Sequence, residues 1–398
     1  MNCVDIFSGC GGLTLGLHKA GVEGLFAIEK SPDAFATLKA NLIDKQKHFR
    51  WPEWLPQQAH DINHVLTDYR EQLTQLRGHV DLLAGGPPCQ GFSLAGRRRN
   101  SDHRNKLVHS YIAMVDAIQP KFLLFENVKG FSIPFSAGES QELYSALVVT
   151  ELRDRGYDVA FELVDFSRFG VPQRRTRFIL IGVCKEMFDR GVRAKSFFTL
   201  LQQKRQQFLA DKDLPNEPIS VRAAISDLLA KNGLYRTDEF RQFDFGHYGA
   251  GKTRYQRLMR GNMAKGRRPD SHRFARHSKT ISERFQIAID EDLSATAYRQ
   301  RFQLKKSSTK RLSPNAPTPT LTTLPDDYIH YCEPRILTVR EYARIQSFPD
   351  DYVFKGKYTT GGKARVKEVP RYSQIGNAIP PLFGEIAGIV LQEMCNGF

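Results

Sequence analysis

The sequence predicts a doubly wound α/β fold with a mostly parallel central sheet and a smaller second domain. Short apolar runs alternate with amphipathic stretches in the first half of the chain, and positive charge gathers in a later segment. The length of 398 residues suits about two domains and a core without disulfides. We expect a first domain at 1–185, a second at 186–330, and a hinge and C-terminal segment at 331–398 that returns to the first.

The expected strands are short apolar runs, most of which end near a glycine or an acidic residue. Amphipathic stretches between them, such as Asp33–Leu42 and Val108–Ile118, are expected to be helices on both faces of the sheet. Ligands bind such sheets at the carboxyl ends of the strands, so the residues after each strand are the first functional candidates. The expected strands are Cys3–Phe7, Leu25–Ile28, Val80–Ala84, Lys121–Phe125, Val159–Val164 and Phe178–Val183.

The formal net charge of +15 predicts an acidic partner. Within 184–330, 28 Lys and Arg residues face 16 Asp and Glu residues, so this segment alone carries a net +12. Gly251–Thr280 holds ten basic residues, one acidic residue (Asp270) and interleaved aromatic and histidine side chains. A single charged run is more often solvated surface, but this concentration favours a nucleic-acid surface.

Several classes of protein are disfavoured. No stretch approaches ~20 consecutive apolar residues, so we expect no membrane span. The start of the chain, MNCVDIFSGC, lacks the pattern of a secretory signal. The six cysteines are scattered and form no CxxC pair, which argues against a zinc ribbon or a disulfide framework. We therefore expect a reducing, cytoplasmic setting and no metal.

The first expected strand runs into a glycine-rich turn, FSGCGG at 7–12, followed by an apolar helix from Leu13. Glycines there allow a tight turn and close backbone approach to a ligand. Glu29 ends the second strand and can accept hydrogen bonds from both ribose hydroxyls, while Asp61 could contact a base amino group at the next strand end. The turn lacks the GxGxxG spacing of dinucleotide sites, so it suits an adenosine without phosphates better than a nicotinamide cofactor.

The segment GGPPCQGFS at 85–93 directly follows the third expected strand. A free cysteine is usually a small buried hydrophobe. Here two prolines and flanking glycines place Cys89 in a loop at the carboxyl edge of the sheet, which favours a nucleophilic thiolate. The residues that follow could bind phosphates beside it: Arg97, Arg98, Arg99 and Arg104.

Glu126 follows the fourth expected strand, where a carboxylate is placed for proton chemistry. The segment QRRTR at 173–177 leads into the last expected strand, so Arg175 and Arg177 are expected to share one face. Two guanidinium groups aimed into a cleft need an anionic or carbonyl partner, either Glu126 or the substrate.

These motifs, together with QIGNAIPP at 374–381, closely resemble those of the DNA (cytosine-5)-methyltransferases and occur in the same order. The resemblance covers about 1–183 and 311–398. It implies an enzyme that flips a cytosine out of double-stranded DNA and transfers a methyl group from S-adenosyl-L-methionine, leaving S-adenosyl-L-homocysteine. By the same resemblance, Cys89 adds to C6, Glu126 binds N3 and the amine, Arg177 binds the carbonyl oxygen, and Arg175 supports the loop.

The resemblance also assigns binding positions and a helix, Thr338–Tyr352, that organises the recognition domain. Phe7 would pack on adenine and Glu29 would bind the ribose. The cofactor positions implied are Phe7, Gly9, Gly11, Gly12, Glu29, Asp61, Ile62, Pro88, Leu107, Asn377 and Ala378. The DNA contacts expected, from the matched loop and from the basic segments, are Gln90, Ser93, Arg97, Arg98, Arg99, Arg104, Arg267, Arg268, Arg273 and Arg276.

Three alternatives stay open. A tRNA cytosine-5 methyltransferase would share the chemistry, but the Cys-Phe-Thr signature typical of that branch is absent. A non-catalytic DNA-binding paralogue would be expected to lose Cys89 or Glu126, and an oxidoreductase would need a dinucleotide motif. Because the chain begins almost at its first motif, we expect a bacterial or phage-type monomer. It would act either beside a restriction endonuclease or as a solitary methylating enzyme. The tryptophans of the insert Lys45–Gln58 are expected to be hydrophobic anchors.

Overall fold

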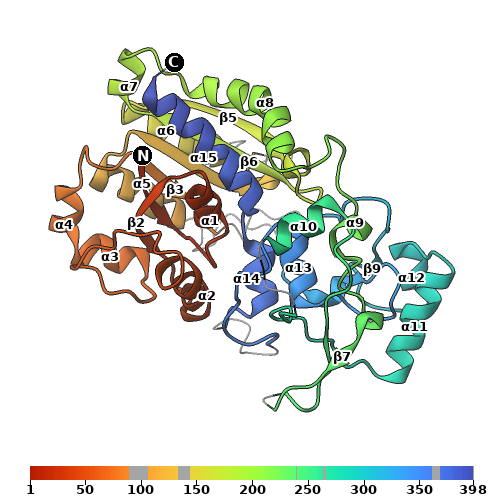
Figure 1. Ribbon diagram of the computed structural model, residues 1–398. Coiled ribbons are helices and arrows are strands. Elements are labelled where there is room, and N and C mark those ends of the chain that lie inside the picture. The colour runs from red at the N-terminus through yellow and green to blue at the C-terminus, as the bar shows by residue number, and fades with distance from the viewer. Residues whose placement is uncertain are drawn as a thin grey trace. The chain divides into compact units, whose positions relative to one another are not determined.

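The computed structural model describes residues 1–88, 106–132, 144–238, 240–261, 263, 266–360 and 368–397. The chain divides into two compact units, which are described separately (Figure 1). Unit 1 comprises Met1–Phe166, Thr176–Gln206 and Phe383–Phe398, and unit 2 comprises Ser167–Arg175 and Gln207–Leu382. The domain boundaries at 185 and 330 stay a prediction, and the division by contacts groups 331–382 with the segment before it.

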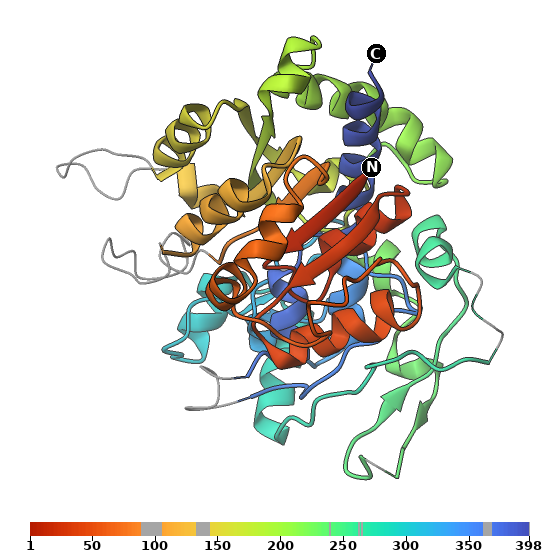
Figure 2. The ribbon, with the colours of Figure 1, turned by 90° about the vertical axis from the view of Figure 1, so that its left-hand side faces the viewer.

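A six-stranded sheet in the order β2-β1-β3-β4-β6-β5 forms the centre of unit 1. The strands β2, β1, β3 and β4 pair in parallel, as the arrows of β1 and β2 show (Figure 2), whereas β6 is antiparallel to both β4 and β5. The predicted α/β fold with a mostly parallel sheet is therefore confirmed. The strands are β1 (Asn2–Ile6), β2 (Glu23–Ile28), β3 (Leu82–Gly85), β4 (Phe122–Val128), β5 (Asp158–Asp165) and β6 (Thr176–Val183).

The helices of unit 1 begin where local sequence caps them and bury one apolar face. Ser31 accepts a hydrogen bond from the backbone N–H of Ala34 at 3.3 Å, and Pro32 opens α2. In α5, Tyr111, Val115 and Ile118 recur at helical spacing and are buried. The helices are α1 (Gly12–Lys19), α2 (Pro32–Leu38, continued by the short π-helix Lys39–Ile43), α3 (Ile62–Asp68), α4 (Arg70–Gln75), α5 (Lys106–Ile118), α6 (Tyr144–Asp154), α7 (Lys185–Asp189), α8 (Ala194–Asp211) and α15 (Pro381–Asn396).

The C-terminal helix α15 lies close against α1. A Cβ added to Gly384 would lie 2.9 Å from the carbonyl oxygen of Leu13, and one added to Gly388 would lie 2.7 Å from the Cβ of Ala20. The side chain of Gln392 donates to the carbonyl oxygen of Ala20 at 2.9 Å. Glycines on this face of α15 therefore permit the contact between the two helices.

Polar and charged residues interrupt the last helices, so the sequence has no run of ~20 consecutive apolar residues. By length and overall composition alone, the helical stretch Arg371–Asn396 is nevertheless apolar enough to cross a membrane. However, 72% of its most apolar part is buried within the protein, as in the core helix of a globular fold. Sequence reasoning missed this length because only Leu382–Met394 was taken as the last apolar helix.

The two tryptophans of the insert pack against the first strands and helices of unit 1. The ring of Trp54 meets Phe26 edge-on at 5.5 Å and Tyr69 at 5.4 Å, and the ring of Trp51 meets Phe35 at 6.0 Å. Both tryptophans join the hydrophobic core of this unit. The prediction that they serve as hydrophobic anchors is confirmed.

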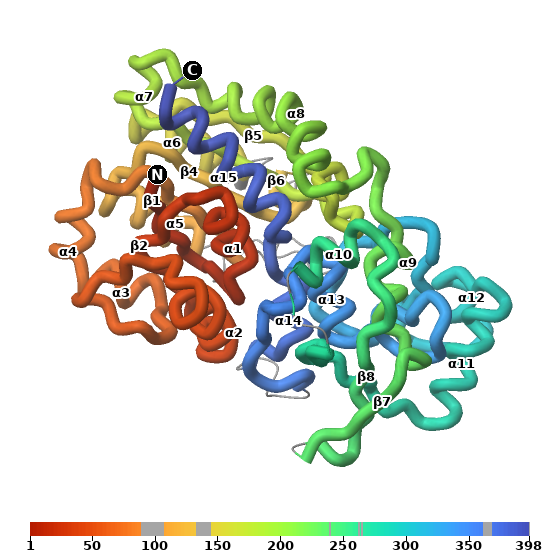
Figure 3. The backbone as a smooth tube through the Cα atoms, viewed as in Figure 1, coloured from red at the N-terminus to blue at the C-terminus, as the bar shows by residue number. Residues whose placement is uncertain are grey.

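In unit 2, every residue of helix α13 is buried, including two arginines and a glutamate. Arg344 bonds Asp227 at 3.0 Å and Asp350 at 2.5 Å, and Arg335 bonds Glu341 at 2.7 Å. α13 packs beside α14, as the blue tube shows (Figure 3). The elements are α9 (Val221–Ile225), η5 (Ala230–Asn232), β7 (Leu234–Tyr235), β8 (Phe245–Gly246), α10 (Arg254–Arg260), α11 (Lys279–Asp290), α12 (Ala295–Arg301), β9 (Lys310–Arg311), η6 (Pro325–Asp327), β10 (Tyr328–Ile329), α13 (Val339–Ile345) and α14 (Arg371–Asn377).

Candidate active site

The turn after β1 is held by the carboxylate of Glu29 at the end of β2. The backbone N–H of Gly9 donates to Oε2 of Glu29 at 2.9 Å, and the N–H of Ser31 donates to Oε1 at 2.7 Å. Phe7, Gly9 and Gly11 all have positive φ, of 57°, 57° and 82°. Phe7 is thus held in a conformation that non-glycine residues rarely adopt, which is a common feature of ligand-binding turns.

Glu29 keeps acceptor capacity for a ligand. Burial raises the pKa of its carboxyl group, and the hydrogen bonds from backbone N–H groups oppose this rise. A carboxylate has about four lone-pair sites, and backbone N–H groups do not fill all of them, so Glu29 can also accept hydrogen bonds from hydroxyl groups. A Cβ built on Gly9 would meet no atom within 4 Å, which leaves space beside the carboxylate.

Asp61 lies next to Glu29 but not at the end of a strand. The N–H of His60 donates to the carbonyl oxygen of Glu29 at 2.9 Å, and Asp61 caps α3 by accepting from the N–H of Asn63 at 2.9 Å. The expected strand before Asp61 was wrong, because the described chain there shows only an isolated bridge between Gly24 and Phe49. Burial alone would raise the pKa of Asp61, but hydrogen bonds from Lys30 and Asn63 lower it overall.

The other expected cofactor residues differ in their surroundings. Phe7 and Leu107 are half-buried against the core of unit 1, and Ile62 is part of that core. Gly12 opens α1 and is buried, and Pro88 is exposed. Unit 1 therefore brings together the first group of expected residues at the ends of β1 and β2, which are Phe7, Gly9, Gly11, Gly12, Glu29, Asp61 and Ile62. Asn377 and Ala378 belong to unit 2, where Asn377 is exposed and Ala378 buried.

Sequence reasoning passed over Asp5, which lies within β1. The hydroxyl of Thr14 in α1 donates to its buried carboxyl group, so the bond ties the strand to the helix on either side of the glycine turn. Burial raises the pKa of Asp5 to about 7. The signal in the sequence was an acidic residue inside an otherwise apolar run.

Glu126 and Arg177 form an ion pair at the carboxyl end of β4. Because β6 is antiparallel to β4, with Val128 opposite Arg177, the first residues of β6 reach this end of β4. The Nε atom of Arg177 lies 3.0 Å from Oε1 of Glu126, and only 11% and 13% of these two side chains is exposed. Burial lowers the pKa of Arg177, and the neighbouring carboxylate opposes this shift. The expected pairing of Glu126 with an arginine is present.

The chain after β3 passes directly over Glu126. A Cβ added to Gly86 would lie 2.8 Å from Oε2 of Glu126, so a side chain at this position would displace the carboxylate that Arg177 holds. The side chain of Asn127 donates to the carbonyl oxygen of Pro87 at 3.4 Å. The residues expected next in this loop lie outside the described residues; they are Cys89, Gln90, Ser93, Arg97, Arg98, Arg99 and Arg104.

Arg175 differs from the expectation that it shares a strand face with Arg177. The strand begins at Thr176, so Arg175 precedes it and belongs to unit 2. There its buried guanidinium group donates to the carbonyl oxygen of Gly376 at 3.0 Å and to Gln173 at 3.5 Å. Of the two arginines, Arg177 forms the ion pair with Glu126.

The basic segment of unit 2 contains both structural and solvent-facing arginines. Arg260 pairs with the buried Asp227, and Arg273 is half-buried, with its guanidinium carbon 3.7 Å from the ring centroid of Tyr358. The remaining three expected DNA-contact residues in this segment are exposed, namely Arg267, Arg268 and Arg276. A purely solvated surface therefore does not describe this segment, because Arg260 and Arg273 have structural contacts within unit 2.

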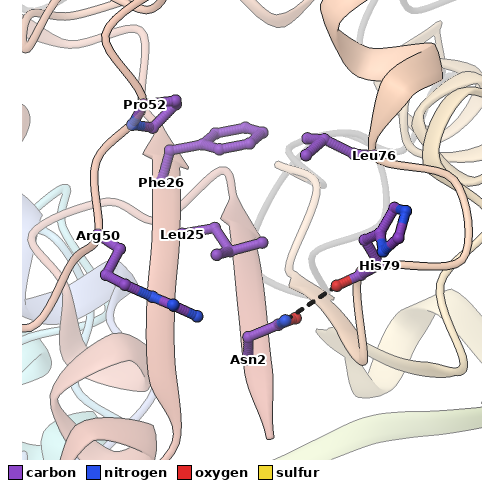
Figure 4. Close-up of a pocket in the computed structure, with 7 residues that line it drawn as sticks. All are labelled: Asn2, Leu25, Phe26, Arg50, Pro52, Leu76 and His79. Carbon is purple, nitrogen blue, oxygen red and sulfur yellow. Dashed lines mark hydrogen bonds between the residues drawn. The ribbon is translucent and has the colours of Figure 1, made fainter.

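A hollow of about 480 Å³ in unit 1 contains none of the expected site residues (Figure 4). It lies beside Asn2, the first residue of β1, whereas the expected residues follow the opposite ends of the strands. Its lining residues are Asn2, Leu25, Phe26, Arg50, Pro52, Leu76 and His79. Among the described residues, no group of three or more His, Cys, Asp or Glu side chains could hold a metal ion.

The fold and the turn at Glu29 define a class, the α/β methyltransferases with a mostly parallel six-stranded sheet. The family model for C-5 cytosine-specific DNA methylases matches residues 1–392. The chain belongs to this family and is a DNA cytosine-5 methyltransferase.

Named relatives agree with this assignment, and a solved structure matches the fold. The chain is 31% identical over 402 residues to the type II methyltransferase M.DdeI of Desulfomicrobium norvegicum, covering 97% of this chain and 87% of that protein. It is 29% identical to M.Bpa9945I of Bacillus paralicheniformis, with 100% of both chains covered. A crystal structure described as a prophage-encoded DNA modification methyltransferase of E. coli matches the fold with a TM-score of 0.65, at 24% identity and 100% coverage of both chains.

Proposed function

We propose that this protein methylates C5 of a cytosine within one short DNA sequence, using S-adenosyl-L-methionine, as the modification enzyme of a restriction–modification pair. The observation that carries the proposal is the buried ion pair between Glu126 and Arg177 beneath Gly86, two residues before the Pro-Cys pair of the loop. The type II methyltransferase relatives support DNA as substrate and the restriction–modification setting. A cognate endonuclease and a monomeric state stay predictions.

The residues at the ends of β1 and β2 fit an adenosyl group. Glu29 offers two carboxylate oxygens to ribose hydroxyls, the half-buried ring of Phe7 offers a face to adenine, and Gly9 leaves open space. When bound, S-adenosyl-L-methionine supplies an electrophilic methyl group. In the sheet, β3 lies between β1 and β4. The residues that would bind the adenosyl group, after β1 and β2, therefore lie on the same edge of the sheet as Gly86 and the Glu126–Arg177 pair.

Activation of the cytosine is assigned to three side chains. C5 of cytosine is a weak carbon nucleophile until the thiolate of Cys89 adds to C6 and shifts electron density to C5. Glu126 binds N3 and the amine, which favours a proton at N3 during this addition. After C5 has taken the methyl group it loses its proton, and the C6–sulfur bond breaks to release the thiolate.

The ion pair sets the orientation of Glu126 and leaves part of Arg177 available. Nε of Arg177 bonds the carboxylate, and Nη1 donates to the carbonyl oxygen of Thr176 at 3.0 Å. A guanidinium group carries five N–H donors, so a further N–H of Arg177 can donate to the carbonyl oxygen of a cytosine bound at Glu126. Because both side chains are largely buried, the base must leave the duplex to reach them, at a cost of a few kcal/mol.

The proposal is tested by bisulfite sequencing of genomic DNA from a methylation-deficient bacterium that expresses the protein. We expect conversion-resistant cytosines in one recurring context, and none with the Cys89→Ala variant. Uniform conversion with abundant folded protein would contradict the proposal. Methylated cytosine in tRNA instead of DNA would establish the tRNA alternative.

A further inference from the structure

The hairpin β7–β8 of unit 2 presents a stack of aromatic rings. Tyr235 lies opposite Phe245 in the hairpin, with ring centroids 5.5 Å apart and planes 28° apart, and it also meets the ring of His247 at 4.8 Å. Phe245 forms a further antiparallel bridge with Arg273. The Tyr235 ring is therefore packed against the opposite strand of the hairpin, and that strand is itself bridged to the segment of Arg273.

Arg268 lies over the ring of Tyr235. Its guanidinium carbon is 4.2 Å from the ring centroid of Tyr235, and its side chain is exposed. No carboxylate within ion-pair distance of Arg268 is present among the described residues. By contrast, Arg236 and Arg241 on the same hairpin pair with Asp244 at 2.8 Å and Asp238 at 3.4 Å. The guanidinium group of Arg268 thus has a cation–π contact with Tyr235 and no carboxylate partner among the described residues.

Two neighbouring arginines lack this combination. Arg273 is half-buried, with its guanidinium carbon 4.0 Å from the ring centroid of Phe243 and 3.7 Å from that of Tyr358, so it binds the hairpin to the rest of unit 2. Arg267 is exposed and has no ring contact among the described residues. Arg268 alone of these three is both stacked and solvent-facing.

We propose that Arg268, stacked on Tyr235, reads a guanine in the recognition sequence, whereas its neighbour Arg267 contacts a phosphate. The inference rests on the proposed function and adds a specificity-determining residue to it. Contact with the ring restricts the motion of the exposed guanidinium group, so less side-chain entropy is lost when its N–H groups form two hydrogen bonds. Guanine offers two acceptors, O6 and N7, at the spacing of that edge in the major groove.

The test compares Arg268→Gln with Arg267→Gln, two adjacent exposed substitutions that remove the same charge. Each purified full-length variant methylates a plasmid library with a randomised site, and bisulfite sequencing gives the preference at every position. Arg268→Gln should lose about 5- to 150-fold of the preference for guanine at one position. Arg267→Gln should weaken binding equally for all sequences and lower the salt slope of affinity by ~0.9.

Two variants of the ring test the stack itself. Tyr235→Phe keeps the aromatic face and should keep the guanine preference, whereas Tyr235→Leu should lose preference at the same position as Arg268→Gln. Thermal unfolding of each variant identifies any loss of fold. Identical preferences for the wild type and a folded Arg268→Gln variant would overturn the inference while leaving the proposed function intact. If the wild type methylates no DNA, the proposed function fails and this inference fails with it.

Discussion

The carboxylate of Glu126 is held between Arg177 on one side and Gly86 on the other. Nε of Arg177 lies 3.0 Å from Oε1, and a Cβ on Gly86 would lie 2.8 Å from Oε2. The two neighbours come from strands on opposite sides of β4, one parallel and one antiparallel to it. The mixed pairing of the sheet is therefore what brings a cation and the loop after β3 to the same carboxylate.

Replacing Arg177 by Met should lower the free energy of unfolding by about 3 kcal/mol, because it leaves a largely buried carboxylate without its cation. The double variant with Glu126→Gln should recover part of this loss, since neither charge then remains. Urea unfolding of both variants and the wild type measures the coupling. Arg236→Met is the matched control, because its pair with Asp244 is exposed and worth less than about 1 kcal/mol. Equal losses at Arg177 and Arg236 would contradict this prediction.

Glu126→Gln alone should reduce methyl transfer by about 100-fold or more while leaving cofactor binding in place, since an amide cannot provide the same proton chemistry. Single-turnover methylation and calorimetric titration with S-adenosyl-L-homocysteine separate the two effects. A parallel loss of cofactor affinity would mean that Glu126 acts through the fold of the sheet edge.

Glu29→Gln should have the opposite pattern and weaken cofactor binding by about 10-fold or more. The amide nitrogen of glutamine would face either the N–H of Gly9 or that of Ser31, so one backbone donor loses its acceptor. Titration with S-adenosyl-L-homocysteine measures the loss. Lys30→Gln, which removes the exposed partner of Asp61, is the control and should change affinity far less.

The sequence was sufficient for the six strands of the central sheet and for the turn at Glu29, because apolar runs and glycine positions are local signals, but the strand expected before Asp61 is absent from the described chain. It was insufficient for Arg175 and Arg177, since the first residue of a strand depends on pairing with a distant strand. Arg177 lies on β6 opposite Val128 and pairs with Glu126, whereas Arg175 precedes the strand.

The recognition segment shows the same limit more strongly. A run of arginines in the sequence carries no information about which ones meet acids, rings or solvent. Arg260 lies against the buried Asp227, Arg273 lies between aromatic rings and Arg268 faces solvent on a ring. These differences arise from chain segments that are distant in the sequence and pack together only in the folded protein. The sequence could therefore propose these arginines as DNA contacts only as a group, and it could not indicate which of them are free to bind DNA.

Asp5→Asn should stabilise the protein at high pH relative to the wild type. Burial raises the pKa of Asp5 from 3.8 in the unfolded chain to about 7 in the folded protein. The contribution of this carboxyl group to the free energy of unfolding is therefore complete below the unfolded-state pKa and is lost as the pH rises through the folded-state pKa. The difference between variant and wild type should therefore grow by up to about 1.4 kcal/mol per pH unit across this window. Urea unfolding at about pH 5 and about pH 8 checks it, with the exposed Asp68→Asn as control. A constant difference would contradict it.

Arg344→Met should be the most destabilising substitution among these, because helix α13 places this arginine between two buried carboxylates. Its guanidinium group bonds Asp227 at 3.0 Å and Asp350 at 2.5 Å, and all three side chains are fully buried. Without Arg344, the ion pairs left to these carboxylates among the described residues are Asp227 with Arg260, and Asp350 with Arg340 at 3.9 Å. The loss of the central cation should cost about 3–5 kcal/mol of unfolding free energy. Arg236→Met, at an exposed pair with Asp244, should cost less than about 1 kcal/mol. If both variants unfold at the same urea concentration, the network on α13 is not what stabilises unit 2.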